Sequence, residues 1–62
     1  MIERFRDFYG CSATIIRRRN KTYSLTIRLG TGKLLYKGTY GTYKGTRIAM
    51  SKWSDCWEKT LA

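Results

Sequence analysis

The sequence predicts a small α+β domain in which a three-stranded antiparallel sheet packs on one C-terminal α-helix. Three observations lead to this prediction. Apolar and polar residues alternate in the middle of the chain, short turn sequences separate the alternating segments, and apolar residues in the last third recur at helical spacing. The 62 residues are expected to form one domain, 1–62. A chain of this size buries only about 60% of its unfolded surface. We therefore expect one small core between the sheet and the helix.

Residues 1–11 are predicted to form an N-terminal arm or a short helix that ends at Gly10. Four apolar side chains in this segment recur at a spacing close to that of a helix. They are Ile2, Phe5, Phe8 and Tyr9.

The sheet is expected over residues 12–41. Residues 23–29 alternate cleanly between apolar and polar side chains, which is typical of a strand with one buried face. β-Branched residues favour a strand over residues 13–19. We expect Asn20-Lys21 to form a two-residue hairpin turn, because asparagine tolerates positive φ. Gly30-Thr31-Gly32 is predicted to form a second tight turn, which leads into a strand over residues 33–40.

Residues 42–61 are predicted to form the helix, with Thr42 as its N-cap. The apolar stripe that indicates this helix is Tyr43, Thr46, Ala49, Met50, Trp53, Trp57 and Leu61. We expect Trp53 and Trp57 to pack against the sheet, because large aromatic side chains on an apolar helix face usually bury their area.

The predicted hairpin turn determines which side chains share a face of the sheet. With Asn20-Lys21 as the loop, Arg17 lies opposite Ser24. The face away from the helix is then predicted to carry Arg17, Arg19, Thr22, Ser24, Thr26, Arg28, Leu34 and Tyr36. Arginines can bind guanine edges and phosphates, hydroxyls allow close approach, and an aromatic ring can pack on a sugar or a methyl group. A slip of one residue would exchange Arg17 and Arg19 for Arg18, whereas Arg28 lies on a strand with clear alternation.

Positive charge is concentrated in one block of the chain. The net charge is +9, and the block from Phe8 to Ser54 contains ten Lys or Arg residues and no Asp or Glu. A surface made for solubility usually mixes both signs, so this block indicates a polyanionic ligand, with a plainly solvated face as the alternative. We expect phosphate contacts from the turns and the helix start, at Arg18, Lys21, Lys33, Thr42, Lys44 and Arg47.

Three strings of residues resemble a known family. They are Ile15-Ile16-Arg17-Arg18-Arg19, Tyr23-Ser24-Leu25-Thr26-Ile27-Arg28 and Leu35-Tyr36-Lys37-Gly38-Thr39-Tyr40-Gly41-Thr42. With them, residues 13–58 resemble the plant ethylene-response-factor DNA-binding domain and the related domains of phage and transposon integrases and of some phage homing endonucleases. The resemblance implies a three-stranded sheet that enters the major groove of DNA, backed by a C-terminal helix. It implies base and backbone contacts at Arg17, Arg19, Thr26, Arg28 and Tyr36.

The sequence offers no residues for catalysis or for a cofactor. It has no histidine, no close pair of carboxylates and no glycine-rich phosphate loop, so we expect neither an enzyme nor a metal site. Cys11 and Cys56 lack the spacing of a zinc site. Two free thiols are favoured over a disulfide, although both remain open. No apolar run has membrane-spanning length, so we expect a cytoplasmic protein with neither a membrane nor a small-molecule partner.

We therefore predict a small basic protein that binds double-stranded DNA through the open face of its sheet. The resemblance further suggests a phage or mobile-element regulator of transcription, acting in the bacterial host cytoplasm. Two alternatives remain open. One is a double-stranded-RNA binder that uses Lys44 and Arg47 on phosphates, and the other is a small basic phage protein that binds and inhibits an acidic host protein. A homodimer or another protein partner is also left open.

Overall fold

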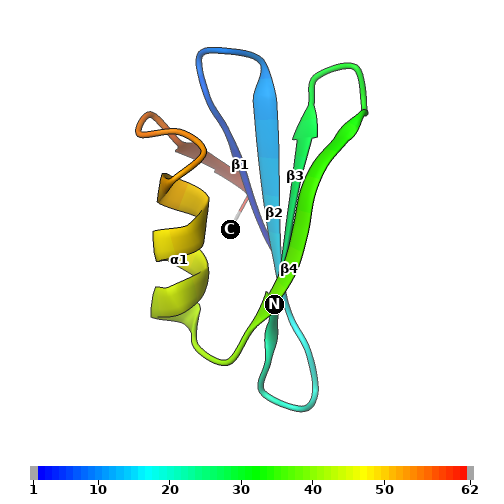
Figure 1. Ribbon diagram of the computed structural model, residues 1–62, viewed down its shortest axis with the longest axis vertical. Coiled ribbons are helices and arrows are strands. Elements are labelled where there is room, and N and C mark those ends of the chain that lie inside the picture. The colour runs from blue at the N-terminus through cyan, green and yellow to red at the C-terminus, as the bar shows by residue number, and fades with distance from the viewer. Residues whose placement is uncertain (1, 62) are drawn as a thin grey trace.

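A computed structural model of the chain describes residues 2–61 and shows a sheet with one helix against one of its faces (Figure 1). In chain order the elements are β1 (Ile2–Arg6), β2 (Cys11–Arg17), β3 (Tyr23–Leu29), β4 (Leu34–Tyr40), α1 (Tyr43–Ser51) and β5 (Glu58–Leu61). The strands form one antiparallel sheet in the order β4-β3-β2-β1-β5. The helix packs on β3 and β4.

The predicted fold class is wrong. The sheet has five strands instead of three, and the helix lies between β4 and β5 instead of at the C-terminus. Residues 2–6 form a strand because Glu3 and Phe5 are buried while their neighbours are exposed, which is a period of two. The predicted helix over residues 42–61 ends at Ser51, and the chain then returns to pair with β1.

Local hydrogen bonds explain both ends of α1. The predicted N-cap is confirmed, since the Thr42 hydroxyl accepts a hydrogen bond from the Gly45 amide at 3.0 Å. At the other end the amides of Lys52 and Trp53 bond back by three residues, which tightens and ends the last turn. Trp57 then turns back, and its indole Nε1 donates to the Met50 carbonyl at 2.8 Å. The helical spacing of the two tryptophans therefore does not reflect a continuous helix.

Three hairpin turns of one type connect the first four strands. The closing backbone bonds are Asp7 to Cys11 at 3.1 Å, Arg18 to Thr22 at 2.8 Å and Leu29 to Lys33 at 2.9 Å. Each turn leaves a three-residue loop whose last residue has positive φ. These residues are Gly10 (85°), Lys21 (65°) and Gly32 (97°), so the left-handed position recurs every eleven residues. Loops of this type commonly combine a tight turn with one left-handed residue.

The predicted register of the β2–β3 hairpin is wrong by one residue. The loop is Arg19-Asn20-Lys21 instead of Asn20-Lys21, so Ile15 pairs with Leu25 and Ile16 with Ser24. A shift of one residue moves every side chain of a strand to the opposite face. The predicted membership of the two faces of β2 is therefore reversed.

A second irregularity moves Tyr36 away from the predicted face. Ile27 pairs with Tyr36 while Arg28 pairs with Leu34, so Leu35 is an extra residue in a β-bulge. Tyr36 consequently lies on the side covered by α1, where it packs beside the core.

The core lies between the sheet and α1. Its buried apolar side chains are Phe5, Ala13, Ile15, Leu25, Ile27 and Met50. Thr46 is fully buried with them, and its hydroxyl donates to the Thr42 carbonyl at 2.8 Å. A core of this size is what a 62-residue chain can build.

An ion pair joins the last strand to the first. The Lys59 ammonium lies 2.6 Å from Glu3 Oε2, and Glu3 is only 7% exposed. The hydrogen bond from Lys59 lowers the pKa of Glu3, and the hydroxyl of Tyr43 lowers it further. A buried carboxylate with a bonded cation therefore helps to hold β5 against β1.

Both cysteines are free, half-buried thiols. Burial raises the pKa of Cys11, and the charge of Asp7 and the nearby Cys56 raise it further. Within residues 2–61, no group of three acidic or cysteine side chains lies close enough to hold a metal ion. No helix within residues 2–61 is long and apolar enough to cross a membrane.

The anchoring role of Trp57 can be tested by substitution. Trp57→Phe keeps an aromatic ring but removes the donor to the Met50 carbonyl, so the free energy of unfolding should fall by about 1 kcal/mol. For a domain of this size, that loss lowers the thermal midpoint by about 4–8 °C. Trp53→Phe is the control, because Trp53 is 47% exposed and should be nearly neutral. Equal losses in the two variants would contradict the anchoring role.

Glu3 should make stability depend on pH on the acid side. Its folded pKa lies below the usual 4.5, so the ion pair stabilises the fold above that pH and the contribution disappears as pH falls through the folded value. In urea unfolding, Glu3→Gln should be less stable than the unaltered chain at about pH 7, and the difference should shrink as the pH falls below the usual pKa of 4.5. Glu58→Gln removes an exposed carboxylate from β5 and serves as the control. A pH-independent loss in Glu3→Gln would contradict the ion-pair explanation.

Candidate nucleic-acid interface

The sheet face opposite α1 carries exposed cations beside small hydroxyl side chains. One cross-strand row joins Arg6, Ser12 and Arg28. The next row joins Arg4, Thr14, Thr26 and Lys37. We call these seven residues the open face. All four of its cations are exposed, and the three hydroxyl side chains between them are half-buried.

Only part of the predicted open face is found there. Thr26 and Arg28 lie on it, and the Arg28 guanidinium donates to the Gly32 carbonyl at 3.0 Å. Ser24 points to the same side but is only 3% exposed, so it offers little surface to a ligand. Tyr36 lies on the opposite face, and Arg17 pairs with Tyr23 at the end of β2. The three-residue turn and the bulge account for these differences.

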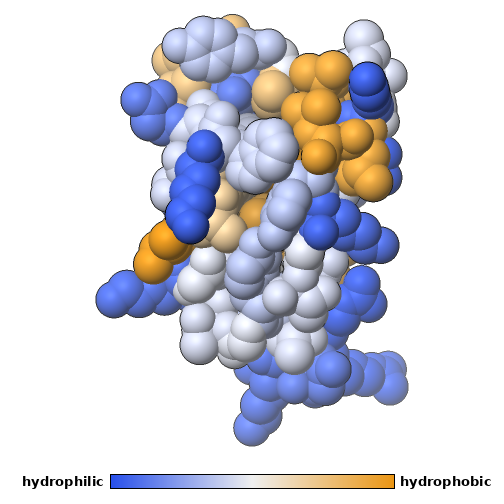
Figure 2. Space-filling view, viewed as in Figure 1, coloured by the Kyte–Doolittle hydropathy of each residue, from blue (hydrophilic) through white to orange (hydrophobic). Residues whose placement is uncertain are grey.

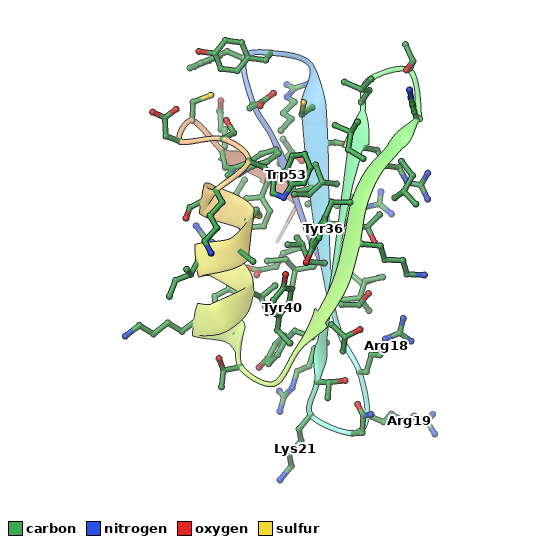
Figure 3. The ribbon with its side chains drawn as sticks, viewed as in Figure 1. Arg18, Arg19, Lys21, Tyr36, Tyr40 and Trp53 are labelled. Carbon is green, nitrogen blue, oxygen red and sulfur yellow. The ribbon has the colours of Figure 1, made fainter. Side chains whose placement is uncertain are left out.

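The β2–β3 turn forms a second basic surface, which we call the basic tip. Its members are Arg17, Arg18, Arg19 and Lys21, and all of them are exposed. Figure 2 shows hydrophilic side chains gathered at the lower end of the molecule, where this turn lies in Figure 1. In Figure 3 the side chains of Arg18, Arg19 and Lys21 point away from the rest of the chain.

Hydrogen bonds within the loop hold the basic tip in shape. The Asn20 carboxamide oxygen accepts from the Thr22 hydroxyl at 2.6 Å and from the Thr22 amide at 3.3 Å. This is a local turn that asparagine commonly stabilises. The loop backbone therefore has a defined conformation from which the cations project.

Lys21 occupies a backbone conformation that favours glycine. The equivalent positions of the other two hairpin turns are Gly10 and Gly32, whereas Lys21 has φ 65° with a full side chain. A left-handed conformation costs a residue with a Cβ about 1 kcal/mol. Backbone strain of this kind is often found at residues that have a function. The left-handed conformation of Lys21 therefore suggests that its positive charge has a function.

The start of α1 has fewer side chains free to contact a phosphate than predicted. Thr42 uses its hydroxyl to cap the helix, and Lys44 is exposed in the first turn. The Arg47 guanidinium lies 4.9 Å from the centre of the Phe5 ring and donates to the Tyr43 hydroxyl at 3.0 Å. Arg47 thus covers the core. Asp55 and Glu58, which fall inside the predicted helix over residues 42–61, lie beyond its end at Ser51.

The four acids are mostly kept apart from the basic surfaces. Glu3 pairs with Lys59 on the core side, and Asp7 Oδ1 accepts hydrogen bonds from the amides of Tyr9 and Cys11 in the first turn. Asp55 follows the helix, and Glu58 lies beside Arg6 on the last strand. No acid occurs on β2, β3 or β4, so the positive charge there is not neutralised locally.

The sequence did not predict several residues of the open face. Arg4 and Arg6 fall in the predicted N-terminal arm or short helix, although their alternation with Glu3 and Phe5 already has the period of a strand. Ser12 and Thr14 are absent from the predicted open face because of the register error, and Lys37 is absent from it because of the bulge. Lys33 was expected at a phosphate, and it is exposed in the β3–β4 turn.

Replacing Lys21 by glycine should stabilise the fold. Lys21→Gly relieves the left-handed conformation, so the free energy of unfolding should rise by about 0.5–1 kcal/mol in urea titrations. Asn20→Gly in the same loop is the control, and it should destabilise because it removes the acceptor for Thr22. A destabilised Lys21→Gly variant would show that the lysine is not strained.

Comparison with protein-family models, with curated proteins and with solved structures found no match for this chain. The resemblance of residues 13–58 to DNA-binding domains of integrase type therefore stays a prediction. The charge, exposure and register of the open face and the basic tip are the features from which a function follows.

Proposed function

We propose that this protein binds double-stranded DNA with the basic tip and the open face together. The main support is a set of eight exposed cations on β1 to β4 and the β2–β3 turn: Arg4, Arg6, Arg17, Arg18, Arg19, Lys21, Arg28 and Lys37. Among the described residues, none of the eight forms an ion pair with a carboxylate. Unpaired cations gathered in this way are the electrostatic footprint of a phosphate-backbone ligand.

The dimensions of the sheet favour the basic tip as the element that enters a groove. Adjacent strands lie about 4.8 Å apart, so the outer strands of a five-stranded sheet are about 19 Å apart. The major groove of DNA is only about 12 Å wide, but it admits a two-stranded ribbon. The β2–β3 hairpin is such a ribbon. The open face then lies against phosphates beside the groove instead of filling it.

The side chains of the basic tip suit both parts of DNA recognition. Arg18 and Arg19 can each bind a phosphate or the edge of a guanine with two parallel hydrogen bonds. Lys21 supplies a point charge for a phosphate. On the open face, small hydroxyls such as Thr14 and Thr26 leave the arginines room to approach the backbone closely.

Double-stranded RNA is less well matched by this arrangement. The major groove of RNA is deep and narrow, so a ribbon cannot reach the bases there. The alternative mode of RNA binding would use the helix start, but Arg47 lies over Phe5 and Thr42 caps the helix. That leaves Lys44 as the exposed cation of the first helical turn. A regulatory role in a phage or mobile element is supported by the resemblance alone.

Fluorescence anisotropy against duplex DNA, duplex RNA and single strands, repeated across salt concentrations, tests this function. Binding to duplex DNA should dominate, with a log–log salt slope of about −4 to −6 if five or six phosphates are neutralised. Arg18→Ala with Arg19→Ala should weaken binding by about tenfold or more and make the slope shallower by about 2.

Lys44→Ala is the matched control, because it removes an exposed cation outside both basic surfaces. It should change the affinity for DNA by less than the tip variant does. Preference for duplex RNA, or a Lys44→Ala loss larger than that of the tip variant, would contradict the proposed mode. Absence of nucleic-acid binding at low salt would overturn the function itself.

A further inference from the structure

The outer edge of β4 is the longest free strand edge of the sheet. β4 has seven residues and stands at one end of the strand order, while β5 at the other end has four. Among the described residues, no strand pairs with the outer side of β4. Its outward amides and carbonyls are therefore available to an added strand.

A groove runs between this edge and α1. It encloses a cavity of about 290 Å³ lined by Tyr36, Tyr40, Gly45, Ile48, Ala49, Lys52 and Trp53. Figure 3 shows Tyr36, Tyr40 and Trp53 between α1 and β4. Trp53 is 47% exposed and Ile48 is 51% exposed, so apolar surface borders the groove at its opening.

Specific contacts shape the walls of the groove. The rings of Tyr36 and Trp53 lie 5.6 Å apart, and the hydroxyls of Tyr36 and Tyr40 share a hydrogen bond. This bond requires Gly38, because a Cβ there would lie 2.6 Å from the Tyr36 hydroxyl. Gly45 lines the same cavity, which gives a reason for a glycine within the first turn of α1. Gly38 thus makes room for the Tyr36 hydroxyl, and a Cβ at Gly45 would lie 3.0 Å from the capping Thr42 Oγ1.

The size of the cavity indicates what it holds. Small-molecule sites span roughly 300–1,000 Å³, so this cavity is at or below the lower limit. One or two apolar side chains fit it better than a cofactor does. A free strand edge next to a groove lined by a helix is an arrangement that binds extended peptides by strand addition.

We propose that β4 binds an extended segment of another protein, in which apolar residues alternate with acidic ones. Successive side chains of an added strand point to opposite faces of the sheet. The apolar side chains would enter the groove beside α1. The acidic side chains would meet Lys37 on the open face, with Arg28 one strand further from the edge.

Charge complementarity selects an acidic partner over a second copy of this chain. The segment from residue 31 to residue 54 contains no acid, and its lysines Lys33, Lys37, Lys44 and Lys52 are all exposed. Lys52 also lines the cavity. Two copies that each carry a net charge of +9 repel one another, and lysines on a strand edge oppose pairing of like edges.

A labelled seven-residue peptide of alternating glutamate and leucine, equal in length to β4, is the probe. It should bind in fluorescence anisotropy, more weakly at high salt, and the β4 amides should gain protection from hydrogen exchange. A strand donates backbone hydrogen bonds to one neighbour from alternate residues only. N-methylation at one set of alternate peptide residues should therefore abolish binding, while N-methylation at the other set should not.

Ile48→Glu should weaken peptide binding by about tenfold or more, because it places a carboxylate in the groove. Ser51→Glu is the matched control, since it adds the same charge on α1 outside the cavity and should have a smaller effect. Circular dichroism should show that both variants keep the fold. Arg18→Ala with Arg19→Ala should retain peptide binding, which separates this site from the proposed DNA site.

Three results would overturn the proposal. The first is equal binding of a lysine–leucine peptide of the same pattern. The second is an equal effect of Ile48→Glu and Ser51→Glu. The third is sedimentation as a dimer in which the β4 amides are already protected, since a second copy would then occupy the edge.

Discussion

The left-handed residue in each hairpin loop is the constraint on which the rest of the structure depends. A strand repeats every two residues, so the length of each loop decides which side chains enter the core. Gly10 and Gly32 adopt positive φ without strain, and Lys21 adopts it at a cost. The three loops together place Phe5, Ile15 and Ile27 on one face, where α1 covers them. The cations of alternate positions are thereby directed to the other face.

This separation gives one sheet two unlike surfaces that meet at β4. The open face is polar and positive, whereas the groove beside α1 is aromatic and apolar. Lys37 belongs to the first surface and Tyr36 to the second, although they are neighbours in sequence. The basic tip is formed by the turn between β2 and β3, away from the edge of β4. The basic tip and the groove are therefore formed by separate residues, whereas Lys37 belongs both to the proposed DNA surface and to the proposed peptide site.

Local chemistry made some of this structure predictable from the sequence. Alternation over residues 23–29 and the hydroxyl of Thr42 correctly indicated a strand and a helix start. The strand β1 was missed because Ile2 and Phe5 fit helical spacing as well as strand spacing over so few residues. Trp53 and Trp57 continue the helical spacing, but Trp57 bonds back to the helix from beyond its end. The register was recoverable, since Gly10 and Gly32 lie evenly on either side of position 21.

The return of the chain to β1 limits how copies of this protein can assemble. Open-ended stacking of sheets needs two compatible edges on every copy. Here one edge strand, β5, has four residues and the other, β4, has seven, so the two edges do not match in length. Any two copies that paired at like β4 edges would be related by a two-fold axis. Such a pair is closed, and only its short β5 edges remain, so fibres are disfavoured by the fold itself.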